Sequence, residues 1–176
     1  DRQEQVTFVD YLSVGEAGLV LKENAAKVTK VEDLAGLNVG ASKGTIAATI
    51  AEQANQQLQA QGLKPMQISL FSGDSAGILA VNSGQIFAHI LDLPFGAYVA
   101  ADPGTEGKYG VVLPNLLMAI PYGISVNKDN MALAKAIQAA LNQMIADGSY
   151  QQILDKWGLG AGAVTEATIN GGTTSA

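Results

Sequence analysis

Short apolar runs alternate with helical patterns along the first two thirds of this chain, and this alternation limits the possible folds more than any other feature. The apolar runs are partly β-branched and span residues 6–9, 17–21, 38–41, 67–71, 86–91 and 116–126. Continuous apolar runs of this kind are typical of strands that are covered on both faces. Strands that alternate with helices predict a parallel α/β sheet.

Helical patterns separate and follow these runs. Apolar residues recur at fourfold spacing from Ile46 to Leu58, which predicts an amphipathic helix that ends at Gly62. Asp74 is expected to cap a second, short helix over residues 75–84. Asp129 or Asn130 is expected to cap a later helix. That helix and the one after it carry apolar stripes that we interpret as core: Leu133, Ile137, Leu141 and Met144, then Tyr150, Ile153, Leu154 and Trp157.

The composition narrows the function classes. The chain has 176 residues, of which 48% are hydrophobic, and a net charge of −6. This length can bury one sizeable core but is short for two complete domains. Its Lys and Arg residues are scattered, so we expect no nucleic acid partner. Cysteine is absent, which removes disulfides and cysteine-metal sites, and we expect no metal and no cofactor.

The segment NVGASKGTI contains Gly-x-Ser-x-Gly, which raises the hypothesis that Ser42 is a hydrolase nucleophile. That hypothesis needs a late histidine as the base, and the single histidine, His89, lies inside the apolar run IFAHIL, where we expect a buried structural residue. A phosphate-binding loop would require Gly-Lys-Ser/Thr, whereas the order here is Lys-Gly-Thr. We therefore predict no catalytic residue in this turn.

Two strand ends point instead to ligand binding. Thr45 opens a helix after one strand, where free N–H groups and the helix dipole favour an anion. Asp92 follows another strand, and ligands of open α/β sheets bind outside such carboxyl ends. Thr45 and Asp92 side by side would hold a zwitterion by its carboxylate and its ammonium group. The alternative is that both residues only cap helices.

A resemblance adds to this interpretation. The ordered segments EDLAGLNVGASKGT, SGQIFAHILDLP, YGISVNKDN and DGSYQQILDKWG, preceded by RQEQVTFVDYLSVGEAGLVL, resemble the second half of an amino-acid-type solute-binding protein of ABC importers. The resemblance runs from Arg2 to about Gly158. It implies the α/β fold of type 2 periplasmic binding proteins, in which two lobes joined by crossing strands close over a ligand. Members bind a solute and deliver it to a membrane permease, without catalysis.

The resemblance also implies roles for four residues. Arg2 matches the arginine that grips the ligand α-carboxylate from the first lobe, and Thr45 matches the hydroxyl that holds it from the second. Asp92 matches the acid that receives the α-ammonium. Ser42 corresponds to a pocket position that varies with substrate class, as does Leu91. Neither is charged, which favours a small or polar-neutral amino acid. Ile46 departs from the family's second Thr or Ser, so one side-chain hydrogen bond is lost.

The resemblance implies an organisation in which residues 14–118 form the second lobe. Residues 1–13 and 119–165 would form the crossing strands and the C-terminal part of the first lobe, and residues 166–176 a flexible tail. Family members carry further sequence before the arginine. We therefore expect the helices within 133–157 to pack on the missing N-terminal lobe or on a second copy. The family implies an extracytoplasmic location, in the periplasm or at the cell surface as a lipoprotein, after removal of a signal peptide.

Two alternatives use the same fold. Cyclohexadienyl-type dehydratases are enzymes of this architecture, but they need an acid or base at the substrate ring, and the turn regions show no carboxylate beyond Asp92. A ligand-sensing module would carry the same ligand groups. Turnover of the ligand separates the enzyme from the binding protein.

Overall fold

The computed structural model describes residues 2–105 and 107–172. The chain divides into two compact units. Unit 1 combines Asp1–Val14 with Ala119–Ala176, and unit 2 is the continuous segment Gly15–Met118. Within the described residues, every helix is too short or too polar to cross a membrane.

A single sheet runs through the fold with the strand order β3-β2-β4-β1-β5, and β6 pairs with β1. β2 pairs in parallel with both β3 and β4, whereas β1 is antiparallel to β4 and to β6. The predicted parallel sheet is therefore wrong in part, because the sheet is mixed. The strands are β1 (Val6–Leu21), β2 (Asn38–Ser42), β3 (Gln67–Phe71), β4 (Ala88–Asp92), β5 (Tyr109–Asn127) and β6 (Thr168–Ile169).

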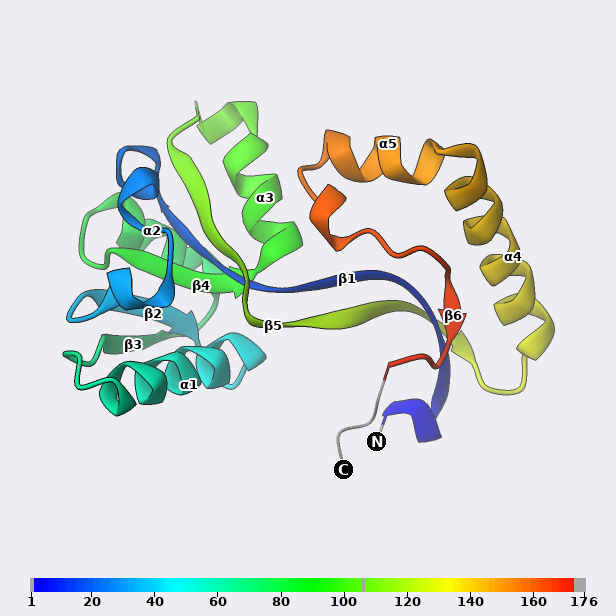
Figure 1. Cartoon of the computed structure of the whole chain (residues 1–176), viewed down its shortest axis with the longest axis horizontal. Coiled ribbons are helices and arrows are strands. Elements are labelled where there is room, and N and C mark those ends of the chain that lie inside the picture. The colour runs from blue at the N-terminus through cyan, green and yellow to red at the C-terminus, as the bar shows by residue number, and fades with distance from the viewer. Residues whose placement is uncertain (1, 106, 173–176) are drawn as a thin grey trace. The chain divides into compact units, whose positions relative to one another are not determined.

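The two faces of the sheet in unit 2 carry different helices, and Figure 1 shows α1 and α3 on opposite sides of these strands. α1 (Ile46–Ala60) packs on one face, against a cluster that includes Val20, Val39 and Ile90. α2 (Asp74–Asn82) and α3 (Leu93–Ala101) pack on the other, against Leu19 and Leu91. The alternation of β4 places Asp92 on the α1 face and His89 on the α2 face.

The elements differ most from the sequence expectation at three places. Two predicted strands, 6–9 and 17–21, are parts of the one long strand β1. α3 was not predicted, since its sequence LPFGAYVAA has no polar face to reveal a helical period. β5 begins before the predicted residue 116. Short 3₁₀ turns lie before β1, at Arg2–Glu4, and between the later elements, at Lys22–Lys27, Val31–Leu34, Pro103–Thr105 and Gly160–Gly162.

Unit 1 carries the two C-terminal helices, α4 (Met131–Asp147) and α5 (Ser149–Lys156). Asn130 caps α4 by accepting a hydrogen bond from the N–H of Leu133, at 3.2 Å. Gly148 ends the helix in the left-handed conformation, with φ 81°, which glycine adopts without a steric penalty.

The apolar stripes of these helices are only partly buried. Tyr150 and Leu154 are buried, and the Tyr150 hydroxyl donates to the Tyr11 carbonyl at 2.7 Å. By contrast, Leu133 is 47% exposed and Ile153 is 48% exposed. The core interpretation therefore holds for only part of the two stripes, and the expectation that these helices pack on a further polypeptide stays a prediction.

Residues 166–172 are ordered by unit 1, although the sequence expected a flexible tail from 166 to 176. Ala167 is fully buried, and its N–H donates to the Asn142 side chain at 2.7 Å. Ile169 in β6 pairs with Val9 of β1. The small side chains of this segment, which indicated disorder, allow close packing on β1. The rest of the expected tail, residues 173–176, lies outside the described residues.

Candidate functional site

A cavity of about 160 Å³ lies in unit 2 where the carboxyl ends of strands meet the start of α1. Because β2 and β4 are parallel, their carboxyl ends lie at the same edge of the sheet. Thr45 follows β2, and Asp92 is the last residue of β4. The cavity is lined by Glu16, Thr45, Ile46, Ala47, Asp74, Leu91 and Asp92.

Thr45 is the N-cap of α1. Its hydroxyl donates to the Ser42 carbonyl at 2.7 Å and accepts from the N–H of Ala48 at 3.4 Å. The cap alternative is therefore right for this residue. Capping uses the N–H of Ala48, and helix geometry leaves the earlier N–H groups of the first turn without intrahelical partners. These groups and the dipole of α1 favour a negative charge at the cavity.

Asp92 occupies the N-cap position of α3, but its side chain makes no capping hydrogen bond. The cap alternative is therefore wrong for Asp92. The residue is exposed at the end of β4 and lines the cavity. Its carboxyl group remains available to a ligand.

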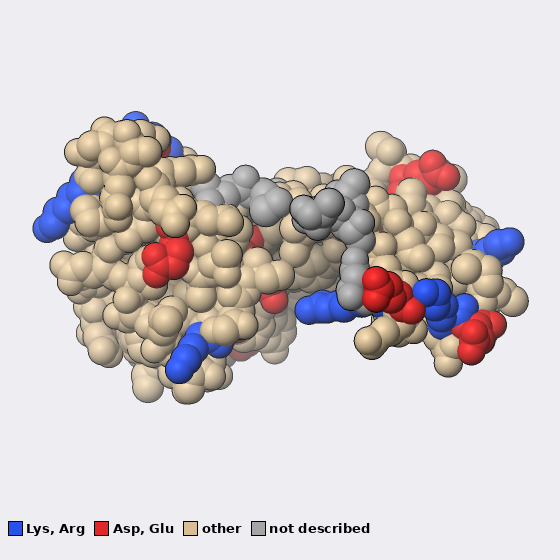
Figure 2. Space-filling view, turned by 90° about the horizontal axis from the view of Figure 1, so that it is seen from below, with Lys and Arg blue, Asp and Glu red and all other residues tan. Residues whose placement is uncertain are grey.

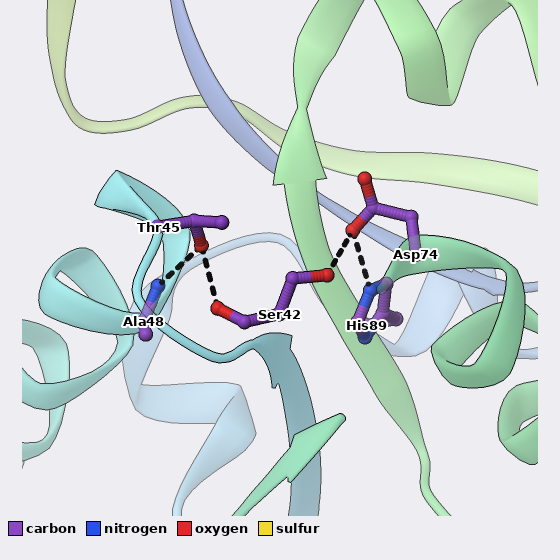
Figure 3. A network of polar contacts seen from close by, with 5 residues as sticks. All are labelled: Ser42, Thr45, Ala48, Asp74 and His89. Carbon is purple, nitrogen blue, oxygen red and sulfur yellow. Dashed lines mark hydrogen bonds and ion pairs between the residues drawn. The ribbon is translucent and has the colours of Figure 1, made fainter. Parts of the chain in front are cut away.

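Ser42 is not part of the cavity lining, but its side chain contacts Asp74, which is. Its hydroxyl donates to Asp74 Oδ1 at 2.6 Å, and His89 Nε2 lies 3.0 Å from the same oxygen (Figure 3). Asp74 was expected to cap α2, but Gly73 holds that position and makes no side-chain cap. The Asp74 carboxyl group instead joins the end of β2 to β4.

The order of these three groups does not suit nucleophilic catalysis, because the carboxylate lies between the serine and the histidine and the imidazole cannot take the serine proton. Burial lowers the pKa of His89, although Asp74 opposes this shift. A neutral ring that donates from Nε2 leaves Nδ1 bare, and Nδ1 has no partner in the described structure. His89 is a fully buried residue that packs on Gly77, where a Cβ atom would overlap the imidazole. The sequence interpretation of His89 as a core residue is confirmed.

Glu16 is a residue of the cavity that sequence reasoning missed. It lies directly opposite Asp92 in the β1–β4 pairing and is 4% exposed. Burial is the main cause that raises the pKa of Glu16 from 4.5 to about 7. The charge of Asp92, a hydrogen bond to Asp92 and the charge of Asp74 raise it further. The available signal was an acidic residue directly before the apolar run 17–21. Glu16 was left between the two predicted strands, 6–9 and 17–21, and was therefore not assigned to a strand.

The structure therefore places two of the four predicted site residues, Thr45 and Asp92, on one cavity. Ser42 is linked to this cavity by its hydrogen bond to Asp74. Arg2 is an exposed residue of unit 1, in the 3₁₀ turn Arg2–Glu4. The sequence interpretation that no carboxylate besides Asp92 lies at the site is wrong, because Asp74 and Glu16 also line the cavity.

Charged groups are dispersed on the face shown in Figure 2. On the face shown in Figure 2, Lys and Arg side chains lie apart or beside acidic ones, and large areas carry neither. Within residues 2–105 and 107–172, no three His, Asp or Glu side chains converge in a way that would hold a metal ion. The carboxyl groups of the cavity are therefore not arranged as a metal centre.

Comparison with known proteins decides the family. Residues 1–160 match the model for bacterial extracellular solute-binding proteins, family 3. The chain belongs to this family. An extracytoplasmic location is the one typical of such solute-binding proteins.

This solute-binding chain is similar to curated proteins and solved structures of amino-acid binders. It is 28% identical over 171 residues to the arginine-binding protein ArgT of Corynebacterium glutamicum, covering 97% of this chain and 55% of that protein. It is 34% identical over 160 residues to the ABC transporter glutamine-binding protein GlnH of Bacillus subtilis, covering 89% and 53%. The structure of an ancestral cationic amino acid solute-binding protein superposes with a TM-score of 0.71 at 26% identity, covering 89% and 63%.

The chain thus spans about half the length of the curated relatives it matches. The structural likeness confirms the expected fold, that of type 2 periplasmic binding proteins. The relatives are named for binding, which agrees with a solute-binding role.

Proposed function

We propose that this solute-binding chain captures an amino acid for an ABC importer and holds its two charged α-groups at the cavity of unit 2. The observation that carries the proposal is the meeting of Asp92 with the N-terminus of α1 on one cavity. Because relatives are named for arginine and glutamine binding, an amino acid is the ligand class that the comparisons favour.

Each α-group has a suitable partner. The α-carboxylate would bind the first turn of α1, where Thr45 fixes the helix end and backbone N–H groups are directed outward. The α-ammonium would bind Asp92, whose side chain does not cap α3. Both contacts are charge-assisted, which makes them stronger than contacts between neutral groups.

Arg2 is proposed as a second ligand of the α-carboxylate, by the family match alone. A guanidinium group can bind a carboxylate through two parallel hydrogen bonds. Delivery to a membrane permease is proposed on the same basis, as is residence in the periplasm or as a lipoprotein at the cell surface. Ser42 is proposed to act on specificity through Asp74, to which it donates.

A second candidate function is a dehydratase-like enzyme on the same fold. Glu16 gives this candidate some support, because a cavity carboxyl group with a pKa of about 7 suits a general acid or base near neutral pH. The sequence had suggested no such extra carboxylate. We favour binding, since the curated relatives are named for amino-acid binding.

An amide NMR titration of the 176-residue chain tests the proposal, because it detects binding even in the millimolar range. At least one of the standard amino acids is expected to shift the amide signals of Thr45, Ile46 and Leu91 in a saturable way. The ligand spectrum of the same sample is followed over time. Unchanged ligand supports a binding protein, and consumption supports the enzyme. The absence of saturable shifts with every amino acid would contradict the proposed function.

We further propose that the N-terminal part of the first lobe, which family members carry before the arginine, covers the exposed apolar side chains of α4 and α5. Leu133 and Ile153 are among these side chains. A chain without that cover is expected to associate as its concentration rises in sedimentation velocity experiments. Leu133→Lys with Ile153→Lys should reduce the association. A monodisperse monomer at high concentration would contradict this proposal.

A further inference from the structure

Three carboxyl groups, from three different elements, line the same cavity. Glu16 comes from β1, Asp74 from the start of α2 and Asp92 from the end of β4. The rest of the lining is Thr45, Ile46, Ala47 and Leu91, so the lining includes no basic side chain. The cavity therefore carries more negative charge than a single ammonium group can balance.

Asp74 presents a fixed charge at this cavity. Its Oδ1 atom receives the hydrogen bonds from Ser42, at 2.6 Å, and His89, at 3.0 Å. Both donors are neutral, since burial lowers the pKa of His89. The second carboxyl oxygen points away from both donors (Figure 3), and the Asp74 side chain is 37% exposed. The two bonds hold the carboxylate in place without cancelling its charge.

Glu16 supplies an independent sign that a ligand donor belongs here. The residue is 4% exposed, and its Oε2 atom has no hydrogen-bond partner in the described structure. An unsatisfied buried acceptor destabilises the fold, because the group has lost its water without gaining another donor. Since Glu16 lines the cavity, a positively charged group bound there would satisfy this oxygen.

The charges of a ligand must match this arrangement. An amino acid with a neutral side chain offers one positive group, for Asp92, and one negative group, for the N-terminus of α1. It leaves the charge of Asp74 without a counter-charge and Oε2 of Glu16 without a donor. A ligand with a second positive group balances the remaining negative charge.

We propose that the ligand is a cationic amino acid and that Asp74 binds its side-chain ammonium or guanidinium group. This inference rests on the proposed function, since it assigns the ligand class of the same cavity. Asp74 is the specificity residue, and its hydrogen bonds to Ser42 and His89 position the carboxylate. A site built around a charged group rejects an analogue that lacks the group, because the buried acceptors are then left unpaired.

Arginine and citrulline test the proposal on the unaltered chain, since they have nearly the same shape and differ in side-chain charge. Arginine is expected to bind at least about tenfold more tightly than citrulline in NMR titrations. Asp74→Asn should remove most of this difference. Glu52→Gln, which changes an exposed acid of α1 outside the cavity lining, should preserve it.

The outcomes separate this inference from the proposed function. Equal binding of arginine and citrulline to the unaltered chain would overturn the cationic ligand and leave amino-acid binding in place. Equal loss of both ligands in Asp74→Asn, with thermal unfolding unchanged, would overturn the role of Asp74 in specificity. If no amino acid of either kind binds, the proposed function itself fails.

Discussion

Replacement of Asp92 by asparagine is expected to weaken amino-acid binding by about 100-fold or more, which corresponds to ~2.7 kcal/mol. An asparagine at this position keeps the shape of the side chain but lacks the negative charge that is proposed to hold the α-ammonium. Asp92 makes no capping bond to α3, so the helix should not change. The measurement is the dissociation constant of the best ligand, from the NMR titration of both chains.

Stability separates this effect from misfolding. Asp92→Asn also removes the like charge opposite Glu16, so the variant should unfold at the same or a higher temperature than the parent. Asp129→Asn, at an exposed acid beside α4, is the matched control and should bind as the parent does. An Asp92→Asn chain that binds with parental affinity would place the α-ammonium elsewhere.

Replacement of Glu16 by glutamine is expected to stabilise the chain relative to the parent, and the gain should grow with pH. The difference in unfolding free energy between variant and parent should increase by about 3 kcal/mol between pH 4.5 and 7. Below pH 4.5, Glu16 is protonated in both the folded and the unfolded chain. Between 4.5 and about 7 the unfolded chain releases this proton, while the raised pKa retains it in the folded chain, so the parent loses stability as the pH rises. The glutamine side chain of the variant cannot ionise and therefore escapes that loss.

The difference in unfolding free energy between the two chains, measured by urea denaturation across this pH range, isolates the effect of Glu16. The comparison between the two chains is needed because His89 changes stability with pH in the opposite direction. Burial lowers the pKa of His89, so its contribution to stability falls as the pH decreases below 6.5 in both chains. Glu52→Gln, at an exposed acid, should show no such trend. A constant difference between Glu16→Gln and the parent at every pH would mean that Glu16 ionises as a solvated acid does.

The sequence was most informative where function depends on the ends of strands. Thr45 and Asp92 follow runs whose direction is set by the α/β alternation, so their meeting at one edge could be expected from topology alone. Asp74 was assigned to a helix cap because an acid before a helical run usually has that role. Only tertiary structure brings the buried ring of His89 to it.

Glu16 was missed for a related reason. Its place opposite Asp92 depends on the antiparallel register of β1 with β4, and the sequence had indicated a parallel sheet. Register across strands that are distant in sequence is set by packing and not by local pattern. The stripe of α4 that includes Leu133 likewise shows which face is apolar and not what covers it.

The discontinuity of unit 1 has a consequence for the order of assembly during synthesis. Unit 2 is one continuous segment, Gly15–Met118, and it contains every residue that lines the cavity. Unit 1 joins the first residues of β1 to helices that are synthesised after unit 2. Because domains tend to fold as they emerge, the acidic cavity can form while the first part of β1 still waits for β6 and α4. The nascent chain would thus acquire its ligand contacts before the two segments of unit 1 meet.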